Sequence, residues 1–207
     1  MAKYTGADCR ICRREGCKLF LKGERCTSKK CAMERRPNVP GVHGAARKKA
    51  TEYSLQLREK QKVKKAYGML EKQFRHYYEL ANNMRTGIVG ENMLSLLERR
   101  LDNVVYRMGI GASRKESRQI VNHGHITVNG KTVNIPSFLV KVDDVIAIKE
   151  NKKELPMFKE LKDVKVVMPK WLEFNSEKLT GKINALPQRD DIDLNIREHL
   201  IVELYSK

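Results

Sequence analysis

The chain has 207 residues, of which 42 are Lys or Arg and 25 are Asp or Glu, so its net charge is +17 at neutral pH. The length allows one domain or two small ones, and a hydrophobic fraction of 41% excludes a wholly disordered chain. No apolar run approaches the roughly 20 residues needed to cross a bilayer, and the N-terminus has no apolar signal core, which predicts a cytoplasmic protein.

The positive charge is concentrated at the N-terminal end. Residues 1–50 hold 14 Lys and Arg against four Asp and Glu, whereas residues 190–207 hold five acids and two bases. A surplus of 17 positive charges indicates a polyanionic partner, either nucleic acid or a membrane surface. The asymmetry suggests that one face lies on the polyanion and another faces water or a protein.

All five cysteines fall within the first 31 residues. Cys9 and Cys12 have the knuckle spacing that lets two thiolates meet one metal, and Cys26 and Cys31 form a second close pair. Disulfides are not expected in the cytosol, so the pattern predicts one structural zinc ion held by these four thiolates. Ordinary reduced thiols and an iron–sulfur cluster are the alternatives.

The fifth thiol, Cys17, heads a short apolar run over 17–21 that is typical of a strand, and Cys17 is expected to be buried. Because the surrounding segment is too charged to build its own apolar core, zinc would supply folding energy. The rigid knuckle would then present fixed cations to phosphate groups. The candidate contacts are Arg10, Arg13, Arg14, Lys22, Arg25 and Lys30.

A loop is predicted over residues 35–44, where two Pro and two Gly disfavour regular structure. Its histidine is expected to contact phosphate or to hydrogen-bond its own loop, rather than to bind a metal. Bases lie at both ends of the loop. The candidate RNA contacts here are Arg35, Arg36, His43, Arg47, Lys48 and Lys49.

Three helices are predicted next, over 52–66, 70–83 and 92–108, since these stretches have good helix formers and no interior Pro or Gly. The aromatic stripe of the second helix is expected in the core rather than stacked on bases. The first helix carries bases that cannot all share one face. Its candidate RNA contacts are Arg58, Lys60 and Lys62.

A capping box predicts a further helix, in which Ser113 caps the N-terminus and Glu116 reaches back. The first turns of this helix carry Arg114, Lys115 and Arg118. Basic side chains beside the exposed amide donors of a helix N-terminus make a phosphate site, and a solvated basic turn is the alternative.

A small antiparallel sheet is predicted after that helix. Asn129-Gly130 is a type I′ hairpin signal between short strands at 126–128 and 131–133, and another strand follows at 145–148. The order of elements is therefore helix, helix, hairpin and strand, in an α+β chain.

Several motifs of this region are familiar. They are Arg100-Leu101-Asp102-Asn103, Ser113-Arg114 and His123-Gly124-His125-Ile126-Thr127-Val128-Asn129-Gly130, and together they resemble the alpha-L RNA-binding fold. With the cysteine spacing and the stretches 32–37, 40–44, 57–62 and 201–206, the whole chain is similar to the family of ribosomal protein four of the bacterial small subunit, in its zinc-binding form. Two departures are the extra thiol of Cys17 and Val42, which stands where the family often has Gln.

The resemblance implies a zinc knuckle over 1–45, a helical domain over 46–98 that is completed by 170–207, and an inserted alpha-L module over 99–165. It implies no enzyme but a structural constituent of the small ribosomal subunit, which binds rRNA, nucleates assembly of the subunit body and contributes to translational accuracy. The implied partners are small-subunit rRNA, neighbouring ribosomal proteins, notably protein five, and its own operon mRNA, with no membrane. In the module, the added RNA contacts are His123, His125, Asn129 and Lys131.

Two other functions fit parts of the sequence. An RNA-modifying enzyme or a stress-type RNA-binding protein can also carry an alpha-L module. The enzyme would need a catalytic Asp in a second domain, and Asp102 is the candidate, although a structural ion pair is expected there. A zinc-bearing DNA regulator would prefer duplex DNA. The sequence has no phosphate-binding P-loop, nucleophile elbow or zinc-protease motif.

Overall fold

The computed structural model describes residues 3–46, 49–162 and 168–206. The chain divides into two compact units, Met1–Met93 with Leu194–Lys207, and Leu94–Asp193. We call them the helical unit and the sheet unit. The boundary falls inside helix α5 (Val89–Glu98). Within the described ranges, no helix is long and apolar enough to span a membrane.

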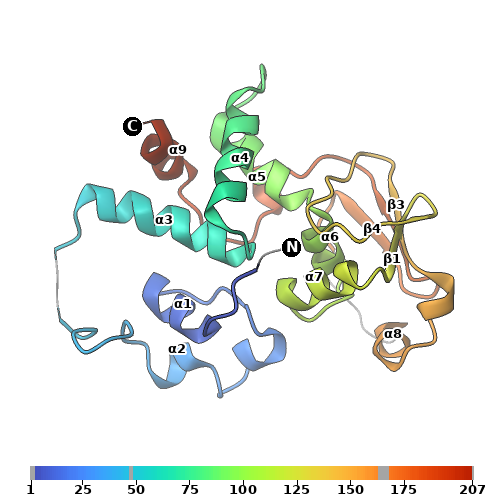
Figure 1. Cartoon of the computed structure of the whole chain (residues 1–207), viewed down its shortest axis with the longest axis horizontal. Helices are drawn as coiled ribbons and strands as arrows, with labels where there is room; N and C mark the ends of the chain where they lie inside the picture. Colours follow the sequence, from blue (N-terminus) through green and yellow to red (C-terminus); the bar gives the residue numbers. More distant parts are fainter. Residues whose placement is uncertain (1–2, 47–48, 163–167, 207) are drawn as a thin grey trace. The chain divides into compact units, whose positions relative to one another are not determined.

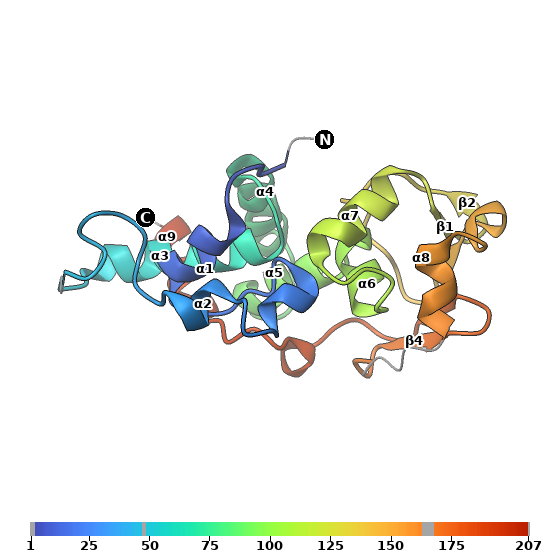
Figure 2. The ribbon, with the colours of Figure 1, turned by 90° about the horizontal axis from the view of Figure 1, so that it is seen from below.

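The helical unit begins with the cysteine segment, which we define as residues 8–46. Helix α1 (Asp8–Glu15) is followed by a 3₁₀ turn at Gly23–Cys26 and by α2 (Ala32–Arg35). Figure 2 shows α1 beside α2 and α3. The strand predicted over 17–21 does not form, because Phe20 has a positive φ of 50° and the chain turns there. That prediction is wrong.

Longer helices build the rest of this unit. Helix α3 (Glu52–Ala66) begins after Thr51, whose hydroxyl accepts the Ser54 N–H, and α4 (Glu71–Asn82) follows. Both match the predicted helices closely. The aromatic stripe of α4 is buried, as predicted, and the C-terminal helix α9 (Glu198–Ser206) packs against α3 (Figure 1).

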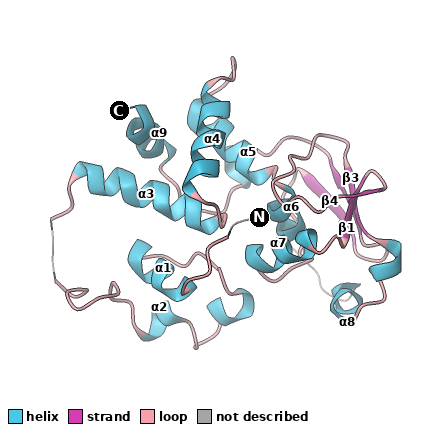
Figure 3. Ribbon diagram, in the orientation of Figure 1, coloured by secondary structure: helices cyan, strands magenta, loops and turns pink. Residues whose placement is uncertain are grey.

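The sheet unit places helices against one face of an antiparallel sheet. Helices α6 (Leu101–Arg107) and α7 (Arg114–Asn122) precede it, and the short helix α8 (Pro156–Lys159) lies between its strands in the chain. The five strands, shown in Figure 3, have the order β2-β1-β3-β5-β4. They are β1 (Ile126–Val128), β2 (Lys131–Thr132), β3 (Val145–Ile148), β4 (Leu172–Asn175) and β5 (Thr180–Ile183).

The core of the sheet unit lies between α6, α7 and the inward face of the sheet. Alternate strand residues point inward, as the period of two requires, so Ile126, Ile146 and Ile148 pack with apolar side chains of both helices. Asn129 and Gly130 have φ values of 49° and 78°, which confirms the predicted type I′ turn between β1 and β2.

Two boundaries differ from the sequence predictions. The helix predicted over 92–108 is two helices, because Arg100 leaves helical geometry, bridges to Leu139 and lets the Leu101 N–H donate to the Phe138 carbonyl at 2.8 Å. The module predicted to end at 165 continues to Asp193, since β4 and β5 pair with β3. Only residues 194–207 return to the helical unit.

Candidate nucleic-acid interface

Four cysteines of the cysteine segment line one small cavity of about 20 Å³. They are the predicted ligands Cys9, Cys12, Cys26 and Cys31, and Cys17 is not among the lining residues. Helix α1 supplies the first two, Cys26 ends the 3₁₀ turn and Cys31 precedes α2. In the described part of the chain, no group of three or more His, Cys, Asp or Glu side chains is arranged to hold a metal ion.

The rest of the cavity lining mixes apolar residues, among them Leu21 and Met33, with charged ones of both signs. The Lys22 backbone N–H donates to Cys26 Sγ at 3.4 Å, and the side chains of Lys22 and Arg25 also line the cavity. Burial raises the pKa of the Cys12 thiol, whereas a backbone hydrogen bond from Leu19 lowers it. The net effect is a raised pKa, to which the neighbouring thiols of Cys26 and Cys9 also contribute.

Cys17 has a different environment. Burial raises the pKa of its thiol, and the charges that act on it come from Lys62, Glu15 and Glu59. The Glu15 carboxylate is itself buried and accepts from Arg58 at 3.0 Å. Cys17 therefore belongs to the junction between α1 and α3 rather than to the four-cysteine cavity.

Most cations of the cysteine segment are exposed to solvent. Arg13 and Lys18 are partly buried: Arg13 Nε donates to the Asn38 carbonyl at 2.8 Å, and Lys18 pairs with Glu34. The predicted contacts Arg47 and Lys48 lie outside the described residues. The exposed predicted contacts are Arg10, Arg14, Lys22, Arg25, Lys30, Arg35, Arg36, His43 and, just beyond the segment, Lys49.

The cations predicted on α3 are used inside the helical unit. Arg58 pairs with Glu15, Lys62 pairs with Glu59 at 2.6 Å, and Lys60 is buried. The structure thus gives the predicted contacts Arg58, Lys60 and Lys62 a structural role. The i,i+3 spacing of Glu59 and Lys62 indicates their pair, but the partners of Arg58 and Lys60 come from other helices and could not be read from spacing.

Glu71 organises part of this internal network. Its carboxylate accepts from Lys60 Nζ and Lys64 Nζ at 2.6 Å each, and from the Tyr205 hydroxyl of α9 at 3.0 Å. Burial raises the pKa of Glu71, but these hydrogen bonds and the lysine charges lower it to about 2. The C-terminal helix is therefore tied to α3 and α4 through one carboxylate, which the sequence analysis did not identify.

The predicted phosphate site at the start of α7 is only partly exposed. Ser113 Oγ accepts the Glu116 N–H as expected, and Glu116 reaches back to the N–H of Ala112 at 2.8 Å. Lys115 is exposed. Arg118, however, is 5% exposed, and its guanidinium lies 3.4 Å from the Asp102 carboxylate, which corrects the prediction that it contacts phosphate.

Asp102 has the structural role that the sequence analysis preferred over catalysis. Its carboxylate accepts two hydrogen bonds from Arg100, at 3.1 Å and 2.8 Å, and it also pairs with Arg118. All three side chains are buried. A carboxylate that is buried between two guanidinium groups is poorly placed to attack a base.

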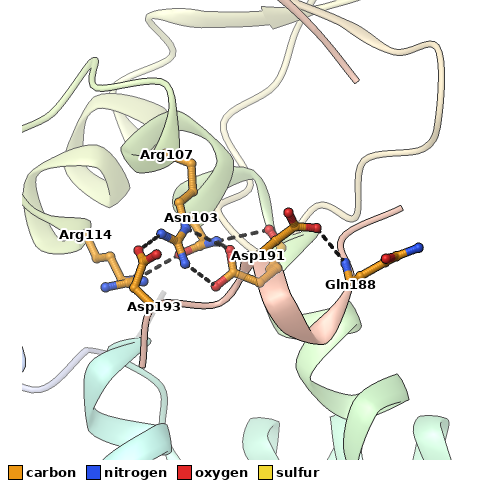
Figure 4. A network of polar contacts seen from close by, with 7 residues as sticks. Asn103, Arg107, Arg114, Gln188, Asp191 and Asp193 are labelled. Atoms are coloured by element: carbon orange, nitrogen blue, oxygen red, sulfur yellow. Dashed lines mark hydrogen bonds and ion pairs between the residues drawn. The ribbon is translucent and has the colours of Figure 1, made fainter. Parts of the chain in front are cut away.

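A second polar network joins α5, α6 and α7 within the sheet unit (Figure 4). The Nε of Arg114 donates to the side-chain amide oxygen Oδ1 of Asn103 at 2.8 Å, and its guanidinium lies 4.5 Å from the Tyr106 ring centroid. Buried Glu98 accepts from Arg107 twice, at 3.0 Å, and Arg107 also pairs with Asp193. Burial lowers the pKa of Arg107, but the charge and hydrogen bonds of Glu98 raise it above its ordinary value.

The remaining predicted contacts lie near the β1–β2 hairpin. His123 and Lys131 are exposed. His125 is half-buried with its ring edge-on to Phe158, and burial lowers its pKa. Asn129 is exposed, and its side chain has partners within the unit: Nδ2 donates to the Asp144 carboxylate at 2.8 Å and Oδ1 accepts the Val145 N–H at 2.9 Å. The hairpin asparagine therefore stabilises the turn.

An acidic cavity of about 380 Å³ adjoins the network of Glu98 and Arg107, with which it shares Arg107 and Asp193. Three aspartates line it together with Tyr106, Arg107 and Lys170, and Figure 4 shows two of them beside Arg107 and Gln188. The aspartates are Asp190, Asp191 and Asp193. With three aspartates against two bases, this lining does not favour phosphate, in line with the reversed charge balance after residue 190.

Similarity to known proteins extends over the whole chain. The family model "Ribosomal protein S4/S9 N-terminal domain" matches residues 3–98, and "S4 domain" matches residues 99–146. Proteins called small ribosomal subunit protein uS4 from Ruminiclostridium cellulolyticum and Caldicellulosiruptor saccharolyticus are each 63% identical over 209 residues, with both chains covered completely. The one from Clostridioides difficile is 62% identical over 208 residues, again over both full lengths. The chain therefore belongs to the small ribosomal subunit protein uS4 family.

Proposed function

We propose that this protein is a structural constituent of the small ribosomal subunit, where it binds rRNA within the cytoplasmic ribosome. Full-length relatives at 62–63% identity carry the name of that subunit. The observation on the molecule that best supports RNA binding is the exposed basic surface of the cysteine segment. We propose that the protein acts by binding alone, without a catalytic step.

The basic surface suits a phosphate backbone. Arg10, Lys22, Arg25, Arg35 and Arg36 are all exposed, in a stretch with 14 bases against four acids over residues 1–50. Each cation that neutralises a phosphate releases counterions, so affinity should come from many such contacts and fall steeply with salt. Folded RNA is recognised through its shape and its backbone, which a rigid cationic surface can follow.

We also propose that the cysteine segment holds one structural zinc ion. Four thiols around one small cavity, one of which accepts a backbone N–H, form the soft donor set that zinc accepts. Cys9, Cys12, Cys26 and Cys31 would hold the ion, which would order the short pieces of this segment. Cys17 would not take part, because it does not line the four-cysteine cavity.

Metal analysis tests the zinc proposal. Cys12→Ser should lose zinc, whereas Cys17→Ser should keep one zinc per chain, measured by elemental analysis of purified protein. The two variants make the same chemical change five residues apart. Zinc loss from the Cys17 variant, or equal zinc content in both, would contradict the assignment.

The finer roles are part of the proposal. We propose that early rRNA binding nucleates the body of the subunit, that the protein contacts protein five and contributes to translational accuracy, and that it also binds its own operon mRNA. The protein offers two chemically different surfaces for such partners, the basic cysteine segment and the acidic cavity of the sheet unit. Opposite charges allow nucleic acid and basic proteins to be bound at separate places.

Binding and fractionation test the main proposal. The protein should co-sediment with small ribosomal subunits and bind protein-free small-subunit rRNA more tightly than an equal length of unrelated RNA or duplex DNA. The slope of log affinity against log salt should be steep. Equal affinity for all three nucleic acids, together with absence from the subunit fraction, would reject the proposal.

A further inference from the structure

Loop 37–44 of the cysteine segment presents an apolar side chain to water at the centre of a basic region. Val42 is 97% exposed, against 64% for Ile88 and 60% for Tyr53. We infer that Val42, at the tip of this loop, makes a non-ionic contact with a nucleobase or ribose of the bound RNA. The inference rests on the proposed rRNA binding and adds a contact of different chemistry to the phosphate contacts proposed above.

The loop is built to hold one shape. A Cβ on Gly44 would come within 1.8 Å of the Val39 carbonyl oxygen, so only glycine allows this close approach. Gly41 has a φ of 118°, which side-chain-bearing residues rarely adopt, and its carbonyl accepts the Gly44 N–H at 3.2 Å. The Ala46 N–H donates to the His43 carbonyl at 3.1 Å. These contacts fix the backbone on both sides of Val42.

The loop is also fastened to helix α1. Arg13 Nε donates to the Asn38 carbonyl at 2.8 Å, and Arg14 Nη2 donates to the Pro40 carbonyl at 3.4 Å. The same helix carries Cys9 and Cys12. The tip of the loop is therefore held to helix α1. Little conformational entropy should be lost when a partner contacts the tip, because the loop is already ordered.

Charge determines which partner fits the tip. Residues 35–51 contain five Lys and Arg and no Asp or Glu, and Arg35, Arg36 and His43 are exposed. Such a surface attracts RNA and offers no acid to a basic protein. The isopropyl group of Val42 gains nothing from a phosphate, but it can cover the apolar face or edge of a base or a ribose.

A truncation tests the contact without endangering the fold. Because Val42 is almost fully exposed, Val42→Ala removes only atoms that lie in water. We expect affinity for protein-free small-subunit rRNA to fall about fivefold, since apolar area would no longer be buried. The slope of log affinity against log salt should not change, because no charge is removed. Ile88→Ala, which truncates another exposed apolar side chain in the same unit, should leave affinity unchanged.

A second variant tests whether the shape of the loop matters. Gly44→Ala should reproduce the loss of Val42→Ala, and the double variant should lose no more than either one, since both remove the same contact. Arg36→Gln should instead make the salt slope shallower by about 0.7–0.9, which shows that the assay separates ionic from non-ionic contacts.

Base-specific chemical probing completes the test. With Val42→Ala, one or a few rRNA bases should regain reactivity while the backbone protection pattern stays the same. Unchanged affinity of Val42→Ala, or a loss accompanied by a shallower slope, would overturn the inference and leave the proposed function standing. If the wild-type protein does not prefer rRNA over unrelated RNA, the proposed function itself fails.

Discussion

The cysteine segment and the sheet unit both contain many arginines, but their arginines lie in opposite environments. In the sheet unit, Arg100, Arg107 and Arg118 are buried and paired with acids of that unit. In the cysteine segment, Arg10 and Arg36 are exposed. A buried guanidinium needs a carboxylate partner, whereas an exposed one can exchange water and counterions for phosphate. Whether a basic region can bind RNA therefore depends on how many of its bases are exposed and unburdened by acidic partners, and not on how many bases it contains.

The largest effect should follow from removing a buried carboxylate of the sheet unit. Asp102→Ala takes away the acid that receives both Arg100 and Arg118, and we expect a loss of about 3–5 kcal/mol in the free energy of unfolding. Urea unfolding measures it. Asp143→Asn is the control, because Asn tolerates the positive φ of 68° at this position and the pair with Lys182 is exposed and should contribute less than about 1 kcal/mol. Similar losses in the two variants would remove the distinction between buried and exposed pairs.

The exposed cations of the cysteine segment should control salt dependence and not stability. We expect the combined change of four bases to Gln to make the rRNA salt slope shallower by about three units, since each phosphate contact contributes about 0.7–0.9. The free energy of unfolding should change little. The four bases are Arg10, Lys30, Arg35 and Arg36.

A matched set of exposed lysines in the sheet unit provides the control. It lies in a part of the chain where acids nearly balance bases, so we expect a slope change of less than about one unit. The control positions are Lys141, Lys159, Lys170 and Lys178. A larger change in the control set than in the cysteine segment would move the interface to the sheet unit.

Removing a helix cap should lower the stability of the protein by a similar amount in the two units. Ser113→Ala removes the hydroxyl that accepts the Glu116 N–H at the start of α7, and Thr51→Ala removes the one that accepts the Ser54 N–H at the start of α3. Each change should cost about 1 kcal/mol of stability. Thermal unfolding of both variants checks this, and the absence of any effect in one unit would mean that its helix is held by packing alone.

Local signals predicted the regular elements well. The helices over 52–66 and 70–83 and the Asn129-Gly130 hairpin depend on propensity, periodicity and turn chemistry, all of which act over a few residues. The single helix predicted over 92–108 failed because its apolar spacing continues through Arg100, where hydrogen bonds to the distant segment 138–139 break it. Strands β4 and β5 were missed because they are short and carry exposed charges at Glu173 and Lys182.

The candidate site also has features that local sequence predicted and features that depend on distant residues. The spacing of Cys9, Cys12, Cys26 and Cys31 identified the four thiols that line one cavity. Helical spacing also showed that Arg114 and Arg118 share a face of α7, but it could not show that this face meets Asp102. Likewise, the acid that receives Lys60 and Lys64 lies on the next helix, and the tyrosine that joins it is near the C-terminus. Long-range pairing decides which bases are exposed, and local sequence does not encode it.

The smallest effect concerns Glu71, where the helical unit pairs its own bases as the sheet unit does. The pKa of this carboxyl is lowered from its ordinary 4.5 to about 2, so its contribution to stability is complete above pH 4.5 and is lost as pH falls toward 2. Its side chain is 46% exposed, so solvent screening limits the effect to below about 1 kcal/mol. Unfolding of wild type and Glu71→Gln should differ at pH 6 and converge between pH 4.5 and pH 2. Glu79→Gln, at an exposed pair with Arg75, should show a smaller difference at pH 6. A gap between wild type and Glu71→Gln that stays constant down to pH 2 would mean that the neutral hydrogen bond from Tyr205, and not the lysine charges, holds α9 in place.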